Sequence, residues 1–256
     1  MSDAVVRYAV SNRVAHVVLD RPPVNALSLD MIRAVVTALR RAAADDEARA
    51  VVLTSAVARQ FCAGLDLAML LDKTGEQIRE FLQALYVDLH DSQYNLGKPS
   101  IAAVGGTARG GGMTMAISCD VIVAGRSATF GYPEINIGVL PAIHFAHLPR
   151  IVGRHRAFEL LFTGRTFDAQ EASELGLVSK VVPDGETDAA ATALAAAFAA
   201  KSPAVMALGR AAFMRQNDLD YRRSIASAVE DFCNVAVTKA AQEGIRAFLE
   251  KRAPNW

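Results

Sequence analysis

The stretch I-A-A-V-G-G-T-A-R-G-G-G-M-T-M-A-I-S-C, from Ile101 to Cys119, decides the fold. It passes from a short apolar run, through five glycines in eight residues, into an apolar segment with small residues at helical spacing. This order predicts a strand, a tight loop and the start of a helix. Glycines let a ligand approach the main chain, and the first N–H groups of a helix lack intrahelical partners. The stretch therefore predicts a site for negative charge, either a phosphate or an oxygen that becomes anionic during a reaction.

The composition excludes several classes of protein. A chain of 256 residues with 52% hydrophobic content has ample material for a core. Lysine and arginine balance aspartate and glutamate at 27 each, so no net field favours nucleic acid or an anionic membrane. The three cysteines have unrelated spacings, which favours buried free thiols over a metal site or disulfides. With no secretory or membrane-spanning run, we expect a cytoplasmic protein.

Strands and helices alternate in the first 140 residues, which predicts an α/β core. Two β-rich runs separated by S-N-R predict an opening hairpin. Ser28 is a plausible N-cap for the amphipathic helix that follows it. The predicted strands are 5–10, 14–19, 50–54, 101–104, 120–124 and 128–131, and the predicted helices are 29–44 and 75–97.

The C-terminal third is predicted to be helical, with one short strand over 177–182. Its helices carry more apolar surface than one core needs, which favours contacts between subunits. We expect a core domain over residues 1–195 and a helical oligomerisation region over 196–256. The predicted helices are 154–162, 168–175, 187–201, 203–216 and 219–251.

The glycine-rich loop does not match the common nucleotide-binding patterns. Gly105 and Gly110 have the separation of a phosphate-binding P-loop, but no Lys-Ser or Lys-Thr follows. The dinucleotide fingerprint lacks its third glycine at Met115. No G-x-S-x-G or H-E-x-x-H is present, so neither a hydrolase elbow nor a zinc site is indicated. We expect no metal and no cofactor.

A second loop of the same kind occurs earlier in the chain. Ala63-Gly64-Leu65 and Gly110-Gly111-Gly112 each follow a predicted strand, and each can direct a main-chain N–H into one cleft. Two convergent amides around a carbonyl oxygen form an oxyanion hole, in which one donor is worth about 3 kcal/mol of transition-state stabilisation.

Several motifs together resemble the crotonase superfamily, that of the enoyl-CoA hydratases and isomerases. They occur in the family's order and spacing and extend to the C-terminal Phe248 to Arg252. The matching segments are 23–27 (P-V-N-A-L), 61–67 (F-C-A-G-L-D-L), 98–104 (K-P-S-I-A-A-V), the triple glycine, Cys119-Asp120, 130–135 (F-G-Y-P-E-I) and 172–182.

This resemblance implies a spiral of β-β-α units, a helical C-terminal region that forms trimers or hexamers, and a coenzyme A thioester as substrate. The N–H groups of Leu65 and Gly111 would hold the thioester oxygen as it becomes enolate-like. Lys251 would reach the phosphates of coenzyme A. The other implied substrate-binding residues are Val24, Ala63, Asp66, Leu67, Ala68 and Gly110.

The acid–base residues depart from the hydratase pattern. Family hydratases use two glutamates, and the corresponding positions here are Thr114 and Glu134. Threonine cannot accept a proton near neutral pH, so a glutamate pair is not available to activate water. A single carboxylate can move a proton from C2 to C4, which favours an enoyl-CoA isomerase that converts 3-enoyl-CoA to 2-enoyl-CoA. The alternatives are a hydratase, other enolate chemistry, or a non-catalytic acyl-CoA-binding member.

A second departure follows Pro141, where many hydratases have a glycine-rich run and this chain has A-I-H-F-A-H. The added bulk should reshape the acyl pocket. His144 is a candidate substitute acid or base, because an imidazole titrates near neutral pH. The competing interpretation is that His144 and His147 only pack on a short helix. Tyr86, Tyr94 and Tyr132 are candidate proton donors, although aromatic residues in or beside apolar segments more often form core or pocket lining.

Overall fold

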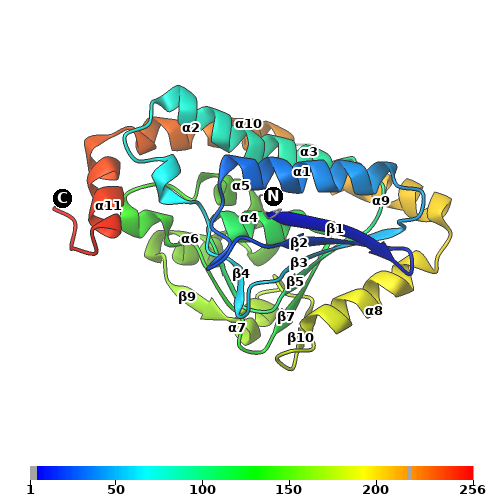
Figure 1. Cartoon of the computed structure of the whole chain (residues 1–256). Coiled ribbons are helices and arrows are strands. Elements are labelled where there is room, and N and C mark those ends of the chain that lie inside the picture. Colours follow the sequence, from blue (N-terminus) through cyan, green and yellow to red (C-terminus); the bar gives the residue numbers. More distant parts are fainter. Residues whose placement is uncertain (1–4, 218–220, 256) are drawn as a thin grey trace.

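The structure, a computed structural model, describes residues 5–217 and 221–255. Within these residues the larger sheet has the strand order β1-β2-β3-β5-β7-β10 (Figure 1). β1 and β2 form the predicted antiparallel hairpin, and the other neighbours are parallel. The strands are β1 (Val6–Ser11), β2 (Val14–Leu19), β3 (Ala50–Ser55), β5 (Ser100–Val104), β7 (Val121–Gly125) and β10 (Lys180–Val182).

A smaller sheet has the order β4-β6-β8-β9. β4, β6 and β8 are parallel, whereas β9 is antiparallel to β8. β9 is not predicted by the sequence, because only Phe167 of its three residues is buried and the run is too short to show alternation. The strands are β4 (Gln60–Cys62), β6 (Thr107–Arg109), β8 (Thr129–Gly131) and β9 (Thr166–Asp168).

Successive strands alternate between the two sheets, and this alternation creates the site. β3, β5 and β7 lie in the larger sheet, and the strand that follows each of them, β4, β6 or β8, lies in the smaller one. Because β4, β6 and β8 are parallel neighbours, their carboxyl ends meet at one edge. The loops that begin at residues 63, 110 and 132 therefore lie together.

The N-terminal helices follow the predicted boundaries, with one difference. α1 (Leu29–Ala44) is capped by the Ser28 hydroxyl, as predicted. The helix predicted over 75–97 is α2 (Gly75–Leu82), the π turn η2 (Gln83–Asp88) and α3 (Leu89–Tyr94). A π turn inserts an extra residue into a helix, and the amphipathic pattern did not indicate it.

Two apolar clusters cover the two faces of the larger sheet. Val51 and Leu53 of β3 belong to the main core with α1, whereas Val52 belongs to a second cluster that includes Ala191 and Ala195 of α8. This alternation is what a strand buried on both faces requires. The remaining helices before residue 200 are α4 (Gly111–Ser118), α5 (Ala142–Val152), α6 (Arg154–Thr163), α7 (Ala169–Glu174) and α8 (Thr187–Ala199).

The C-terminal helices are α9 (Pro203–Asn217), α10 (Tyr221–Ala236) and α11 (Lys239–Leu249). The single helix predicted over 219–251 is wrong, because Thr238 accepts a hydrogen bond from the Ala241 N–H and starts a new helix; residues 219 and 220 lie outside the described ranges. In the described part of the chain no single helix is long and apolar enough to cross a membrane, and only α8 with part of α9, bent by 106°, meets the criterion as a pair.

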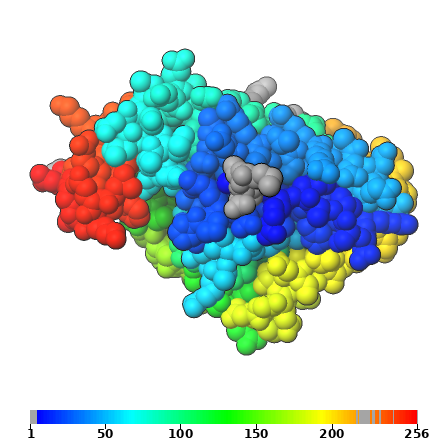
Figure 2. All heavy atoms as spheres, in the orientation of Figure 1, coloured from blue at the N-terminus to red at the C-terminus, as the bar shows by residue number. Residues whose placement is uncertain are grey.

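α11 lies against the segment that precedes α2. The Gln242 side chain accepts a hydrogen bond from the Asp72 N–H at 2.9 Å and donates one to the Leu70 carbonyl at 3.2 Å. Figure 2 shows the C-terminal residues, in red, packed beside this segment, in cyan. The C-terminal helix is thereby joined to the segment between the 3₁₀ turn η1 (Leu67–Met69) and α2, and it also contacts the 3₁₀ turn η3 (Pro133–Ile137).

Candidate active site

The two predicted amide loops lie against each other. Gly64 has φ +95° and lies so close to the other loop that an added Cβ would be 2.9 Å from the Arg109 carbonyl and 3.5 Å from the Gly111 nitrogen. A glycine is required there for both the backbone angle and the space. The structure thus brings the backbones around Leu65 and Gly111 together, as the sequence predicts.

The N–H groups of Leu65 and Gly111 share an uncommon property. Neither donates a hydrogen bond within the described residues, although the adjacent Leu27 and Asp66 N–H groups do. Gly111 is the first residue of α4, whose N–H has no intrahelical acceptor. Two unpaired donors in adjacent loops can bind one oxygen atom that develops negative charge.

Glu134 lies beside the Gly110–Gly111 peptide. It projects from η3, and its Oε1 would be 2.8 Å from a Cβ added to Gly110, whose φ is +47°. The Oε2 atom is buried and has no hydrogen-bond partner in the described structure, although other atoms of the residue reach the surface. Burial raises the pKa of this carboxyl from 4.5 to about 7. Glu134 can therefore both accept and return a proton near neutral pH.

Apolar side chains lie against Gly111, and two tyrosines lie near the Glu134 carboxyl. Leu27 and Leu85 lie against Gly111, with side-chain atoms 2.8 and 3.4 Å from the position of an added Cβ. Tyr86 and Tyr132 are buried, and the pKa of each hydroxyl is raised first by burial and then by the Glu134 charge. Leu27 belongs to the P-V-N-A-L motif and Leu85 to no motif, and neither was predicted as a site residue because an apolar side chain carries no chemical signal.

Thr114 and His144 are in contact at the same place. Both are buried, and the Thr114 Oγ1 lies 3.2 Å from the His144 Nε2. The Nε2 atom is also 3.4 Å from the Gly110 carbonyl oxygen. Burial lowers the pKa of His144 to about 3, so the imidazole is neutral at neutral pH. The structure thus places His144 and Thr114, the residue at the position of the first hydratase glutamate, next to the triple glycine.

A row of buried rings leads away from the site to a groove. The His144 ring centroid is 4.5 Å from that of Tyr132 and 5.8 Å from that of His147, which is 4.6 Å from His90. His90 and His147 line a groove of about 1250 Å³ between α3, α5, α9 and α10. Glu134, Gly111 and Leu65 do not line it, so this groove is distinct from the candidate active site.

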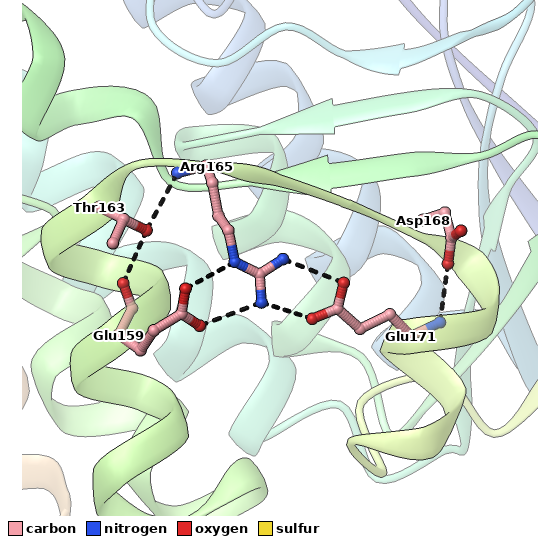
Figure 3. Close-up of polar contacts among 5 residues, drawn as sticks. All are labelled: Glu159, Thr163, Arg165, Asp168 and Glu171. Carbon is pink, nitrogen blue, oxygen red and sulfur yellow. Dashed lines mark hydrogen bonds and ion pairs between the residues drawn. The ribbon is translucent and has the colours of Figure 1, made fainter.

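An ion-pair cluster holds the segment that precedes α7 (Figure 3). Arg165 donates hydrogen bonds to both carboxylate oxygens of Glu159, at 2.6 and 3.0 Å, and to both of Glu171, at 2.5 and 3.0 Å. We call these three residues the Arg165 clamp. It links α6 to α7 across β9, which pairs with β8 directly before the Glu134 turn. The Asn136 amide in η3 also donates to the Gly164 carbonyl, at 3.3 Å.

The residues predicted to bind coenzyme A divide into two groups. Val24, Ala63 and Asp66 lie together, because the Ala63 N–H donates to the Val24 carbonyl and Asp66 follows the bridge between Leu27 and Leu65. Leu67 and Ala68 continue this segment as the 3₁₀ turn η1 (Leu67–Met69). Asp66 forms an ion pair with Arg21 at 3.0 Å, which the sequence did not predict.

Lys251 belongs to the second group. It is exposed, follows α11 and adopts φ +53°, and within the described residues its side chain forms no hydrogen bond or ion pair with the other predicted site residues. Because α11 contacts η3, the lysine lies at the end of an element that borders the site. Its contact with coenzyme A stays a prediction.

Solved structures share this arrangement of two sheets and helices, which is the crotonase-like α/β fold. An enoyl-CoA hydratase/isomerase from Pseudoalteromonas atlantica T6c superposes with a TM-score of 0.86 at 30% identity, covering 99% of this chain and all of the other. An enoyl-CoA hydratase from Bacillus anthracis has a TM-score of 0.80 at 32% identity, with 99% of both chains covered.

Sequence comparisons agree with the fold. The profile of the enoyl-CoA hydratase/isomerase family matches residues 9–256. The 2,3-dehydroadipyl-CoA hydratase of Escherichia coli is 35% identical, with all of this chain and 99% of that protein covered. The mitochondrial enoyl-CoA hydratase domain-containing protein 3 of Rattus norvegicus is 34% identical over 95% of this chain and 81% of its own length. The chain belongs to the enoyl-CoA hydratase/isomerase family, within the crotonase superfamily.

Proposed function

We propose that this enzyme shifts the double bond of a 3-enoyl-CoA to give the 2-enoyl-CoA. The observation that carries the proposal is one buried carboxyl, Glu134, with a pKa near 7 beside two unpaired N–H groups. The position that carries a second glutamate in family hydratases holds Thr114, which has no proton-accepting role near neutral pH.

The proposed reaction moves one proton and two electron pairs. The Glu134 carboxylate removes a proton from C2, and the C–H electrons pass into the thioester to give a dienolate. The Leu65 and Gly111 N–H groups donate hydrogen bonds to the resulting oxyanion. Each donor contributes about 3 kcal/mol of transition-state stabilisation. The electron pair then returns through C2 and C3, and C4 takes the same proton from Glu134. Because the carboxyl ends as it began, no water or second base is consumed.

We place the coenzyme along the segment formed by Val24, Ala63 and Asp66 to Ala68, with Lys251 toward its phosphates. The thioester end then lies at Gly110 and Gly111, where the two amide loops meet. The apolar wall of Leu27, Leu85 and Tyr86 would surround the reacting carbons and keep water from the dienolate.

We also propose that the protein acts as a trimer or as a hexamer of two trimers. The supporting observation is the apolar exposed surface of α9, where Val205, Leu208 and Phe213 are 69%, 73% and 66% exposed. Exposed apolar patches of this kind are typical of subunit contacts. Light scattering of the purified protein measures the assembly, and a monomer would contradict the proposal.

Hydration of 2-enoyl-CoA is the second candidate. It is favoured by the Nδ1 atom of His144, which is buried without a hydrogen-bond partner in the described structure and could orient water, and by the hydratase names of the relatives above. The low pKa of His144 makes it a weak base, which is why we place isomerisation first.

Parallel assays of a 3-enoyl-CoA and a 2-enoyl-CoA test the proposal. We expect the 3-enoyl substrate to be converted to the conjugated thioester, which is followed by its ultraviolet absorbance. Formation of 3-hydroxyacyl-CoA without isomerisation would support the hydratase. Binding of coenzyme A thioesters with no turnover of either substrate would support a non-catalytic family member.

A further inference from the structure

The carbonyl of Gly110 and the N–H of Gly111 belong to one peptide group. Three donors surround this carbonyl oxygen: the Thr114 N–H at 3.1 Å, the Thr114 hydroxyl at 3.5 Å and the His144 Nε2 at 3.4 Å. The first is the ordinary helical bond of α4, whereas the other two come from side chains. The peptide that carries one of the proposed oxyanion donors is therefore held from its opposite end.

The contact fixes the tautomer of His144. A carbonyl oxygen only accepts hydrogen bonds, so the nitrogen that faces it carries the proton. The same Nε2–H can be shared with the Thr114 oxygen at 3.2 Å, while the threonine hydroxyl donates to Gly110. In the opposite tautomer the lone pair of Nε2 would face a lone pair of the Gly110 carbonyl oxygen. That tautomer would also bury an N–H at Nδ1 without an acceptor. The neutral Nε2–H form is thus the stable one.

Packing holds the imidazole at this position. His144 lies in the first turn of α5, and its N–H donates to the Pro141 carbonyl at 2.9 Å. The Tyr132 ring is tilted against it at 4.5 Å between centroids. The side chain is only 1% exposed, so water does not compete for the Gly110 contact. A donor of fixed position therefore faces this carbonyl.

We propose that His144 and Thr114 are positioning residues, which hold the Gly110 carbonyl and thereby aim and polarise the Gly111 N–H toward the thioester oxygen. Hydrogen bonds in a chain strengthen one another, by about 10–30% for each bond in condensed-phase estimates. Donation to the Gly110 carbonyl makes the Gly111 N–H a stronger donor and prevents the peptide from rotating. The inference rests on the proposed function, because it assigns the Gly111 N–H to the oxyanion hole.

Vibrational spectroscopy of a bound thioester tests this inference directly. The probe is butyryl-CoA labelled with ¹³C at the thioester carbonyl, which cannot isomerise. We expect the wild-type enzyme to lower the carbonyl stretching frequency relative to solution. His144→Leu and Thr114→Val should lose part of that shift, whereas His144→Gln, which keeps an N–H donor, should retain more of it than His144→Leu.

Kinetics supply the second readout. We expect kcat to fall about 2- to 10-fold in His144→Leu, the range of a single hydrogen bond, with the Kd for butyryl-CoA unchanged. Thr187→Val is the matched control, because Thr187 is equally buried and its hydroxyl has no hydrogen-bond partner in the described residues. It should leave both the frequency shift and kcat unchanged.

The results of these measurements distinguish a failure of the positioning role from a failure of the proposed function on which it rests. No frequency shift in the wild-type enzyme would refute the oxyanion hole and hence both proposals. A wild-type shift that His144→Leu and Thr114→Val retain in full overturns the positioning role alone, as does a His144→Gln variant that behaves like His144→Leu. If His144→Leu does not fold, Thr114→Val, which removes only a hydroxyl, decides the question. Glu134→Gln should keep the shift while it loses turnover.

Discussion

Glu134 and Glu171 are carboxylates in elements that follow two paired strands of the smaller sheet, β8 and β9, and their surroundings give them opposite properties. Glu134 follows β8, and burial raises its pKa to about 7. Glu171 lies in the first turn of α7, which follows β9, the partner strand of β8, and its hydrogen bonds to Arg165 lower its pKa. One carboxyl exchanges protons near neutral pH, whereas the other stays ionised.

A comparison of the two carboxylates shows that the presence or absence of a cationic partner, more than the residue type, distinguishes a structural carboxylate from a candidate catalytic one. The Arg165 guanidinium donates to all four carboxylate oxygens of Glu159 and Glu171, so each charge is hydrogen-bonded and one of the two is compensated. Within the described residues no cation pairs with Glu134 and its Oε2 atom has no hydrogen-bond partner, so burial makes its charged form costly. The unpaired group is the one that can do acid–base work.

Replacement of Glu134 should have the largest effect. Glu134→Gln keeps the size of the side chain but cannot take a proton from C2, so we expect kcat to fall by about 10²- to 10⁴-fold. The measurement is steady-state turnover of a 3-enoyl-CoA, with butyryl-CoA binding as a check of the site. Glu174→Gln, an exposed carboxylate on α7, is the control and should retain full activity. Equal turnover in both variants would remove Glu134 from the mechanism.

The pH dependence of the rate tests whether the group that titrates is the buried Glu134 carboxyl or a paired carboxyl such as Glu171. The base form of Glu134 is required, so kcat/KM should rise with pH and reach its midpoint near 7. A carboxyl with a partner, such as Glu171, would titrate below its ordinary range instead. Rates measured from pH 5 to 9 check this prediction, and a midpoint below pH 5 would show that the buried carboxyl is not the titrating group.

Stability should depend on pH with opposite sign at the two carboxylates. Because the folded pKa of Glu134 is raised from 4.5 to about 7, the folded state binds the proton more tightly, and stability falls as pH rises through this interval. The difference in free energy of unfolding between Glu134→Gln and the wild type should therefore move in favour of the variant by up to about 3 kcal/mol from pH 4 to pH 9.

Urea unfolding of Glu134→Gln and Glu171→Gln at both pH values measures the contrast. Glu171 has a lowered pKa, so its contribution is present above its unfolded pKa and disappears in acid. We expect Glu171→Gln to lose at most about 1 kcal/mol of unfolding free energy at pH 9, because the ion pair is partly exposed. The same sign for both variants would contradict the assignment of their environments.

Loss of the Arg165 clamp should have the smallest effect. Arg165→Ala removes the link between α6 and α7 and loosens the strand that pairs beside the Glu134 turn. We expect kcat to fall about 2- to 5-fold, in line with the energy of an exposed ion pair, and the pH midpoint to remain near 7. Arg156→Ala, on the exposed face of α6, is the matched control. A loss as large as that of Glu134→Gln would give the clamp a direct role.

Much of the fold could be predicted from local patterns. The hairpin, the Ser28 cap and the start of α4 at Gly111 depend on residues close in sequence, and the structure has each of them. β9 and the break at Thr238 were missed, because three residues show no alternation and a capping threonine inside an apolar pattern gives a weak signal. The division at residue 195 stays a prediction.

The candidate site shows the same limit. Glu134 and the two amide loops could be named from motifs, but the contact between His144 and Gly110 joins residues 34 positions apart. The tyrosines that lie near the Glu134 carboxyl, Tyr86 and Tyr132, come from two separate segments, 46 residues apart. Neither a pKa nor a tautomer can be derived until such segments are placed together.

The π turn η2 has a consequence for how this pocket can change. Leu85 and Tyr86 both lie within it, one against Gly111 and the other near Glu134. A π turn holds one residue more than an α-helical turn, and each residue of an α-helix advances by about 100°. A one-residue deletion here would rotate part of the pocket wall away while α2 and α3 kept their lengths. Insertions and deletions in this helix could therefore alter which acyl groups are accepted without any change to the catalytic residues.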